Sequence, residues 1–196
     1  MPLLMLMELP GATTEQYDRV NEILGVGTDE APPGLISHHA GRAGDGLLIV
    51  DVWESEDALG RFLDSGLRDA AGKAGLPEVP PRVLPVHNII EHGAGTEPAV
   101  LMIAEIEGSG PDVYDRMVAG MDAHVSDGSR HPSVSHVAAK TERGGILVVD
   151  VWDSPESFGR FAEEQIGPEA SKAGLGPIEP RFVPIHSRIV RARAAV

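Results

Sequence analysis

Two sets of side chains suited to proton transfer recur along the chain at nearly constant spacing. Each set joins histidines to an aspartate and a tryptophan: His38, Asp51, Trp53 and His87 in the first half, and His136, Asp150, Trp152 and His186 in the second. Imidazole titrates near neutral pH and can move protons, while a carboxylate can orient the ring and stabilise its charged form. A tryptophan offers a flat apolar wall to an aromatic ligand. The two sets therefore indicate acid–base chemistry on an apolar substrate.

The side chains divide into expected catalytic and substrate-binding groups. The catalytic candidates are His87, His186, Asp51 and Asp150, and the substrate-binding candidates are Trp53, Trp152, His38, His136, Val83 and Phe182. Structural alternatives stay open for each. Asp51 could be a carboxylate bonded to a hairpin or to Arg82, Trp53 a packing residue, and His87 a strand-end histidine. Alternation does not assign His38 to one face of its strand. The simplest interpretation of the two tyrosines, Tyr17 and Tyr114, is that they are core residues of their helices.

Most other catalytic motifs are missing from the sequence. The histidine spacings match no recognised metal motif, and neither an HExxH sequence nor a G-x-S-x-G elbow, P-loop or GxGxxG occurs. We therefore expect no metal ion, and no residue implies a prosthetic group, although a diffusible flavin or haem stays open.

The sequence around the first aspartate is duplicated in tandem. Residues 47–55 (LLIVDVWES) return as 146–154 (ILVVDVWDS), and Gly60-Arg61-Phe62 returns 99 positions later. Tyr17 and Tyr114 match at an offset of 97, so the copies differ by small loop insertions. We expect two modules of similar size, residues 1–92 and 97–196, joined by a linker over 91–97 that contains two glycines.

Each copy has the pattern of a β-α-β-β-α-β module. Apolar runs at 3–9, 35–40, 47–53 and 82–90 predict strands, and capping residues predict helices that begin after Thr13 and Ser55. This order is the ferredoxin-like split βαβ unit, whose helices cover one face of the sheet only. Two copies could cover each other's bare faces, which predicts an α+β fold of two ferredoxin-like modules that form a barrel within one chain.

Strand alternation places the candidate residues relative to this barrel. Leu48, Val50 and Val52 form a uniformly aliphatic face that suits the helices, which leaves Asp51 and Trp53 for a cavity between the sheets. The same reasoning assigns His87 and His186, with Val83 and Phe182, to the cavity side of the last strand of each copy. His38 aligns with His136 if the following turn is one residue longer in the second copy.

The strand-to-helix junction Val-Asp-Val-Trp-x-Ser, with a Phe seven positions after the Ser, resembles the dimeric α+β barrel superfamily. Its antibiotic biosynthesis monooxygenase branch is the nearest match, and the resemblance covers both copies nearly end to end. The resemblance implies a tryptophan in the pocket wall and both barrel halves in one chain, where members usually use two chains. Haem degradation is disfavoured, because the haem-degrading branch of the superfamily needs a histidine on the helix after this tryptophan, and residues 56–63 and 156–163 contain none.

Composition limits the classes of partner and the cellular location that we expect for the protein. The net charge of −14 disfavours nucleic acid and anionic membranes, both of which need clustered Lys and Arg. The absence of cysteine fits a reducing cytoplasm, and the apolar start at 2–7 predicts a strand rather than a signal peptide because Glu8 follows and 99–105 repeats it. An apolar small molecule is the expected partner, and a homodimer is plausible through edge strands.

The resulting hypothesis is an enzyme acting on an apolar aromatic or polyketide-like metabolite. By resemblance, cofactor-independent monooxygenation is the first reaction to test, with a substrate enolate or phenolate activating dioxygen. His87 or His186 would be the base, and Asp51 or Asp150 would orient it. A cyclase or isomerase that uses the same groups, or a ligand-binding protein without catalysis, are the alternatives.

Overall fold

The computed structural model describes residues 1–26, 31–91, 97–125, 133–176 and 178–190 of the 196-residue chain. The chain divides into two compact units, which we describe separately. The first contains Met1–Pro85 together with the chain from Val183 onward, and the second contains Val86–Phe182. Part of the linker expected at 91–97 lies outside the described residues.

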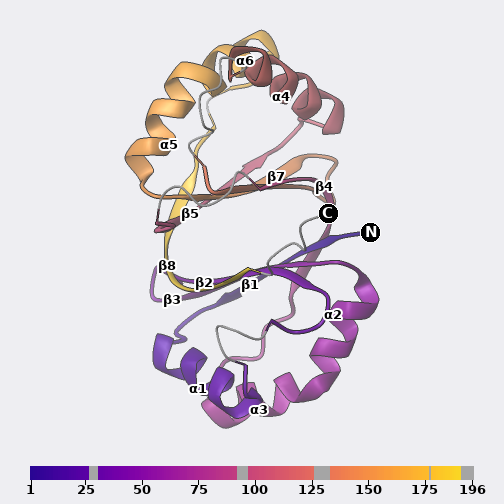
Figure 1. Cartoon of the computed structure of the whole chain (residues 1–196), viewed down its shortest axis with the longest axis vertical. Coiled ribbons are helices and arrows are strands. Elements are labelled where there is room, and N and C mark those ends of the chain that lie inside the picture. The colour runs from indigo at the N-terminus through magenta and orange to yellow at the C-terminus, as the bar shows by residue number, and fades with distance from the viewer. Residues whose placement is uncertain (27–30, 92–96, 126–132, 177, 191–196) are drawn as a thin grey trace. The chain divides into compact units, whose positions relative to one another are not determined.

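The first unit has the predicted element order. Its elements are β1 (Leu3–Leu9), α1 (Thr14–Leu24), β2 (Leu35–Ala43), β3 (Gly46–Trp53), α2 (Glu56–Phe62), a π-helical turn η1 (Leu63–Leu67), α3 (Arg68–Ala74) and the start of β4 (Arg82–Glu91). The strands are antiparallel in the order β4-β1-β3-β2, which is the ferredoxin-like arrangement, and β8 (Arg181–Val190) pairs with β2. The helices lie together on one face of these strands (Figure 1).

The second unit repeats this plan. Its further elements are β5 (Val100–Ile106), α4 (Pro111–Val125), β6 (Ser135–Lys140), β7 (Ile146–Trp152), α5 (Pro155–Phe161), a π-helical turn η2 (Ala162–Ile166) and α6 (Gly167–Lys172). β7 pairs with β5 on one side and β6 on the other, and β6 pairs with the second half of β4. Again the helices cover one face of the strands (Figure 1). The predicted α+β class and ferredoxin-like plan are confirmed.

The compact units and the sequence repeats end at different places. Residues Arg82–Pro85 of β4 pair with β1 in the first unit, whereas Val86–Glu91 pair with β6 in the second. Correspondingly, β8 pairs with β2 of the first unit over Ser37–Gly41. Each unit therefore receives the end of its last strand from the other repeat, and this determines which histidine reaches which site.

Local sequence explains where the helices begin. Thr13 accepts a hydrogen bond from the Gln16 backbone, and the Gln16 side chain accepts one from the Thr13 backbone, so the predicted capping box is present. Ser55 and Ser154 cap α2 and α5, as predicted. The predicted irregular continuation of the second helix is also present, because Gly66 interrupts it with a φ of 101°.

The orientation predicted for β3 is wrong. Trp53 and Ile49 pack in a core with Tyr17 of α1 and with Ala58 and Leu59 of α2, so their face of the strand meets the helices. Every residue of β3 is buried, including Leu48, Val50 and Val52 on the opposite face. Hydrophobicity alone therefore could not distinguish the two faces, and Asp51 lies on the helix side of the sheet rather than in a cavity between sheets.

Among the described residues, no helix combines the length and the apolar character needed to cross a bilayer.

Candidate active site

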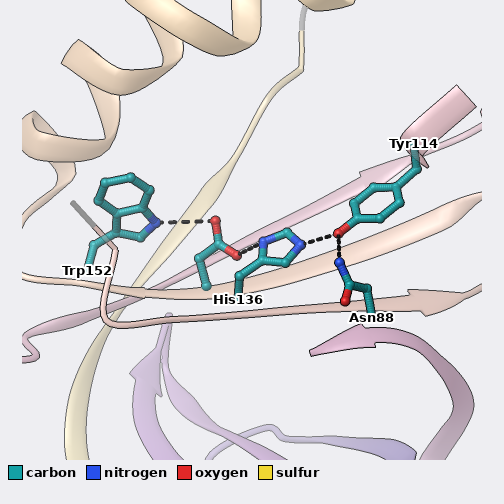
Figure 2. Close-up of polar contacts among 5 residues, drawn as sticks. Asn88, Tyr114, His136 and Trp152 are labelled. Atoms are coloured by element: carbon teal, nitrogen blue, oxygen red, sulfur yellow. Dashed lines mark hydrogen bonds and ion pairs between the residues drawn. The ribbon is translucent and has the colours of Figure 1, made fainter. Parts of the chain in front are cut away.

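A chain of hydrogen-bonded side chains crosses the interior of the second unit (Figure 2). His136 Nδ1 lies 2.6 Å from Asp150 Oδ1, and His136 Nε2 lies 2.6 Å from the Tyr114 hydroxyl. The Asn88 amide donates to the same hydroxyl at 3.0 Å, and Trp152 Nε1 donates to Asp150 Oδ2 at 3.4 Å. The phenol is thus linked to the carboxylate through the imidazole.

The first unit contains the same arrangement. His38 Nδ1 lies 2.6 Å from Asp51 Oδ1, and His38 Nε2 lies 2.6 Å from the Tyr17 hydroxyl. Ser187 hydrogen-bonds to Tyr17 where Asn88 bonds to Tyr114. One difference is that Trp53 Nε1 has no hydrogen-bond partner among the described residues. We call these two chains the Tyr–His–Asp relays.

Strand register brings each relay together. His136 on β6 is the cross-strand partner of Asp150 on β7, and His38 on β2 is the partner of Asp51 on β3. Directly opposed residues have their side chains on the same face, at a separation that suits a hydrogen bond. The predicted alignment of His38 with His136, with a turn one residue longer in the second copy, is confirmed. The tyrosine then reaches the ring from the helix above.

His87 and His186 occupy a different position from the predicted one. His87 Nε2 lies 2.7 Å from Asp115 Oδ1, and His186 Nε2 lies 2.9 Å from Asp18 Oδ1. The predicted pairing of His87 or His186 with Asp51 or Asp150 is therefore wrong. Each of these two histidines meets the edge of the relay tyrosine, at ring-centre distances of 5.6 and 5.8 Å.

The face predicted for the last strand of each copy is wrong, as it is for β3. Val83 pairs with the core residue Met5, and Phe182 packs against Phe158 of α5, so the face that they share with His87 and His186 meets the helices. β-Bulges follow at these histidines, since the register shifts between Val86 and Asn88 and between Ile185 and Ser187. The bulges bring the next residues, Asn88 and Ser187, to the same side, where they bond to the relay tyrosines.

The remaining predicted binding residues contribute mainly to packing. Trp53 and Trp152 are fully buried against Phe62 and Phe161 respectively. Phe182 packs edge-on against Phe158, and Val83 is 38 % exposed. Of the six predicted binding residues, the larger cavity described below is lined by His136 alone, and the smaller one by His38 and Trp53.

Each relay lies in the wall of an apolar cavity between the sheet and the helices of its own unit. In the second unit the cavity measures about 480 Å³ and is lined by Tyr114, His136 and Asp150 among mostly aliphatic and aromatic side chains. In the first unit the cavity at Tyr17, His38 and Asp51 measures about 110 Å³. Small-molecule sites range from about 300 to 1,000 Å³, so only the larger cavity has that size.

Burial and nearby charges shift the pKa values of two relay side chains, His136 and Tyr17. Burial lowers the pKa of His136, but the charge of Asp150 and its hydrogen bond outweigh this, so the pKa lies above the ordinary value of 6.5. Burial raises the pKa of Tyr17 above 10, although hydrogen bonds from Ser187 and Asn21 oppose the change. Tyr17 thus stays protonated at neutral pH, and in the second unit the imidazole of His136 is the group that gains or loses a proton.

The tyrosines were missed as site residues from the sequence. The chain contains only two, Tyr17 and Tyr114, and they occupy matching positions in the two copies. The signal available in the sequence was that tyrosine occurs at only one position of each copy, and that this position is the same in both. No group of three or more His, Cys, Asp or Glu side chains that could hold a metal ion occurs among the described residues.

Comparisons of sequence identify no relative: neither models of protein families nor curated proteins match the chain. Comparison of structures finds similar chains of nearly the same length. A candidate monooxygenase from Lactobacillus acidophilus NCFM is 11 % identical with a TM-score of 0.68, and the match covers 96 % of each chain.

Two further structures cover the chain as fully. A ferredoxin-fold protein related to antibiotic biosynthesis monooxygenases, from Listeria monocytogenes 4b F2365, is 12 % identical over 95 % of each chain, with a TM-score of 0.56. An anthrone oxidase-like protein is 13 % identical over 100 % of this chain and 97 % of its own, with a TM-score of 0.55. The chain therefore has the ferredoxin-like fold of these monooxygenase-related proteins.

Proposed function

We propose that the protein is a cofactor-independent monooxygenase that acts on an apolar aromatic or polyketide-like substrate in the cavity of the second unit. The observation that carries this proposal is the Tyr114–His136–Asp150 relay in the wall of a 480 Å³ apolar cavity. The names of structurally similar proteins, among them candidate monooxygenases and an anthrone oxidase-like protein, support oxygenation as the reaction.

The relay supplies a base in an apolar environment. When His136 is neutral and carries its proton on Nδ1, this N–H donates a hydrogen bond to Asp150. Nε2 then accepts a hydrogen bond from the Tyr114 hydroxyl. A proton taken from a substrate can then pass through the phenol to Nε2, and the charge of Asp150 stabilises the imidazolium that forms. Asn88 keeps the hydroxyl in place by donating to its oxygen. This arrangement gives Tyr114 and His136 catalytic roles and Asp150 and Asn88 positioning roles.

The chemistry requires a substrate with an acidic C–H bond that is conjugated to a ketone, either directly or through an aromatic ring. Loss of that proton gives a carbanion that transfers electrons to dioxygen, and recombination with a proton gives a hydroperoxide. Loss of water from the hydroperoxide leaves a carbonyl. The net reaction converts a CH₂ group and O₂ into C=O and H₂O, with dioxygen as the oxidant and the substrate as the electron donor.

Oxygen consumption with anthrone as the probe tests the proposal. The wild-type protein should accelerate oxygen uptake and anthraquinone formation above the spontaneous rate at pH 7. His136→Gln should lower the rate by at least about 100-fold, since general base catalysis contributes roughly 10²–10⁴-fold. Arg143→Gln is the matched control in the same unit, because Arg143 is 81 % exposed and its side chain bonds only to Glu107 among the contacts described.

Other outcomes would replace the proposal. Enzyme-dependent exchange of the methylene protons for deuterium without oxygen uptake would leave a proton-transfer enzyme, such as an isomerase or cyclase. Binding of anthrone without exchange or oxidation would indicate a ligand-binding protein. Unchanged oxygen uptake in a His38→Gln/His136→Gln double variant would rule out the relays as the base.

A further inference from the structure

We infer that the second unit alone binds the substrate, and that Ser109 recognises an oxygen atom of the substrate. Two differences between the units carry this inference. One is the size of the cavity, and the other is a buried hydroxyl without a partner in the larger one. The inference takes its ligand class, a fused aromatic compound, from the proposed function.

Matching positions on the strands explain the difference in volume. Met5 and Met102 both lie opposite the relay aspartate, which aligns β1 with β5. Two residues further along, the cross-strand pair Met7 and Ile49 lines the first cavity, and Ala104 and Val148 line the second. At this position, therefore, the second unit lacks the long thioether side chain that Met7 places in the wall of the first cavity. Ala104 is therefore the residue that opens the site.

The helix wall of the larger cavity suits an apolar ligand. Met117 and Met121 of α4 line it, where Val20 and Leu24 of α1 line the smaller one. Methionine has an unbranched, polarisable side chain that adapts to irregular shapes. These side chains can therefore adjust around a flat ring system once the strand face beneath them is open.

Ser109 is a buried polar residue of this cavity that takes no part in the relay. It is 1 % exposed, it lines the cavity, and its Oγ has no hydrogen-bond partner among the described residues. The matching residue of the first copy is Ala12, which is also buried but carries no polar group. A buried hydroxyl without a partner costs about 1–3 kcal/mol, which a ligand oxygen would recover.

Binding of two non-reactive quinones tests the inference. The probes are 2-hydroxyanthraquinone and anthraquinone, titrated calorimetrically into the full chain. We expect one site per chain and tighter binding of the hydroxylated probe. Ser109→Ala should weaken the hydroxylated probe by about 5- to 10-fold, as expected for one neutral hydrogen bond, and leave anthraquinone unchanged. Ala104→Met should weaken the binding of both probes by at least 10-fold. Met7→Leu, a substitution at the matching position of the first unit, should weaken the binding of neither.

Several results would overturn the inference. These are two equivalent sites per chain, no binding of either quinone, an equal effect of Ser109→Ala on both probes, or an effect of Met7→Leu as large as that of Ala104→Met. Ser109→Ala removes a single atom from a buried site, so it keeps the test valid if Ala104→Met fails to fold. The quinones are not oxygenated, so their binding does not depend on the proposed reaction. If the quinones bind as expected but anthrone causes no enzyme-dependent oxygen uptake, the proposed function is rejected and this inference is retained.

Discussion

Replacement of His39 by valine should make the protein more resistant to acid. His39 is 4 % exposed on β2, and its Nε2 has no hydrogen-bond partner among the described residues. Burial, together with the charges of His38 and Arg188, lowers its pKa from 6.5 to about 3. Valine is the natural choice, because Val137 occupies the matching position in the second unit, opposite Val149 as His39 is opposite Val50.

The sign and size of the effect follow from proton linkage. Between pH 6.5 and 3 the unfolded chain binds a proton at His39 that the folded chain does not, so the free energy of unfolding falls as the pH falls. With pKa values of 6.5 and about 3, the loss between pH 7 and 4.5 is on the order of 2–3 kcal/mol. The His39→Val variant should not suffer this loss.

Urea unfolding at pH 7 and at pH 4.5 measures the difference. At pH 7 the two proteins should differ little in unfolding free energy, and at pH 4.5 the variant should be more stable by roughly 2–3 kcal/mol. Titration of carboxylates is common to both proteins and cancels in the comparison. Val137→His should introduce the same acid sensitivity into the second unit. An equal loss of stability in wild type and His39→Val would refute the reasoning.

Three further predictions concern single interactions. Asp150→Asn should lower the pKa of His136, because the buried imidazole loses the charge that raises it; an unchanged NMR titration would contradict this. Tyr17→Phe should lower the free energy of unfolding by about 1–3 kcal/mol, measured in urea, since the partly buried imidazole of His38 loses its partner. Gly46→Ala should destabilise the first unit, because its Cβ would clash with the Leu9 backbone carbonyl; an unchanged melting temperature would argue against this contact.

The sequence predicted the elements well because their signals are local. Thr13 and Ser55 cap their helices through contacts three residues away, and the period-two pattern of the strands is visible in a short window. The alignment of His38 with His136 was also predictable, since the repeat fixes the position of each aspartate and only the turn length differs.

The orientation of the site residues was not predictable from the same signals. β3 is buried on both faces, so its aliphatic residues carry no information about which face meets the helices. The bulges at His87 and His186 leave no trace in the hydrophobic pattern, and they bring Asn88 and Ser187 to the helix side, where alternation would not place them. The exchange of strand ends between units depends on long-range pairing, and it places His87 beside Tyr114 rather than Tyr17.

The presence of a relay in both units does not by itself assign catalysis to both. The tyrosine and aspartate of each relay are buried, and removing one member leaves its neighbour without a partner at a cost of about 1–3 kcal/mol. A unit that binds nothing would thus keep its relay for stability alone, as we infer for the first unit with its cavity of about 110 Å³. Features that stability does not require are therefore the better indicators of a site. The open space at Ala104 and the unpaired hydroxyl of Ser109 are such features, since each forgoes packing or hydrogen bonding in the absence of a ligand.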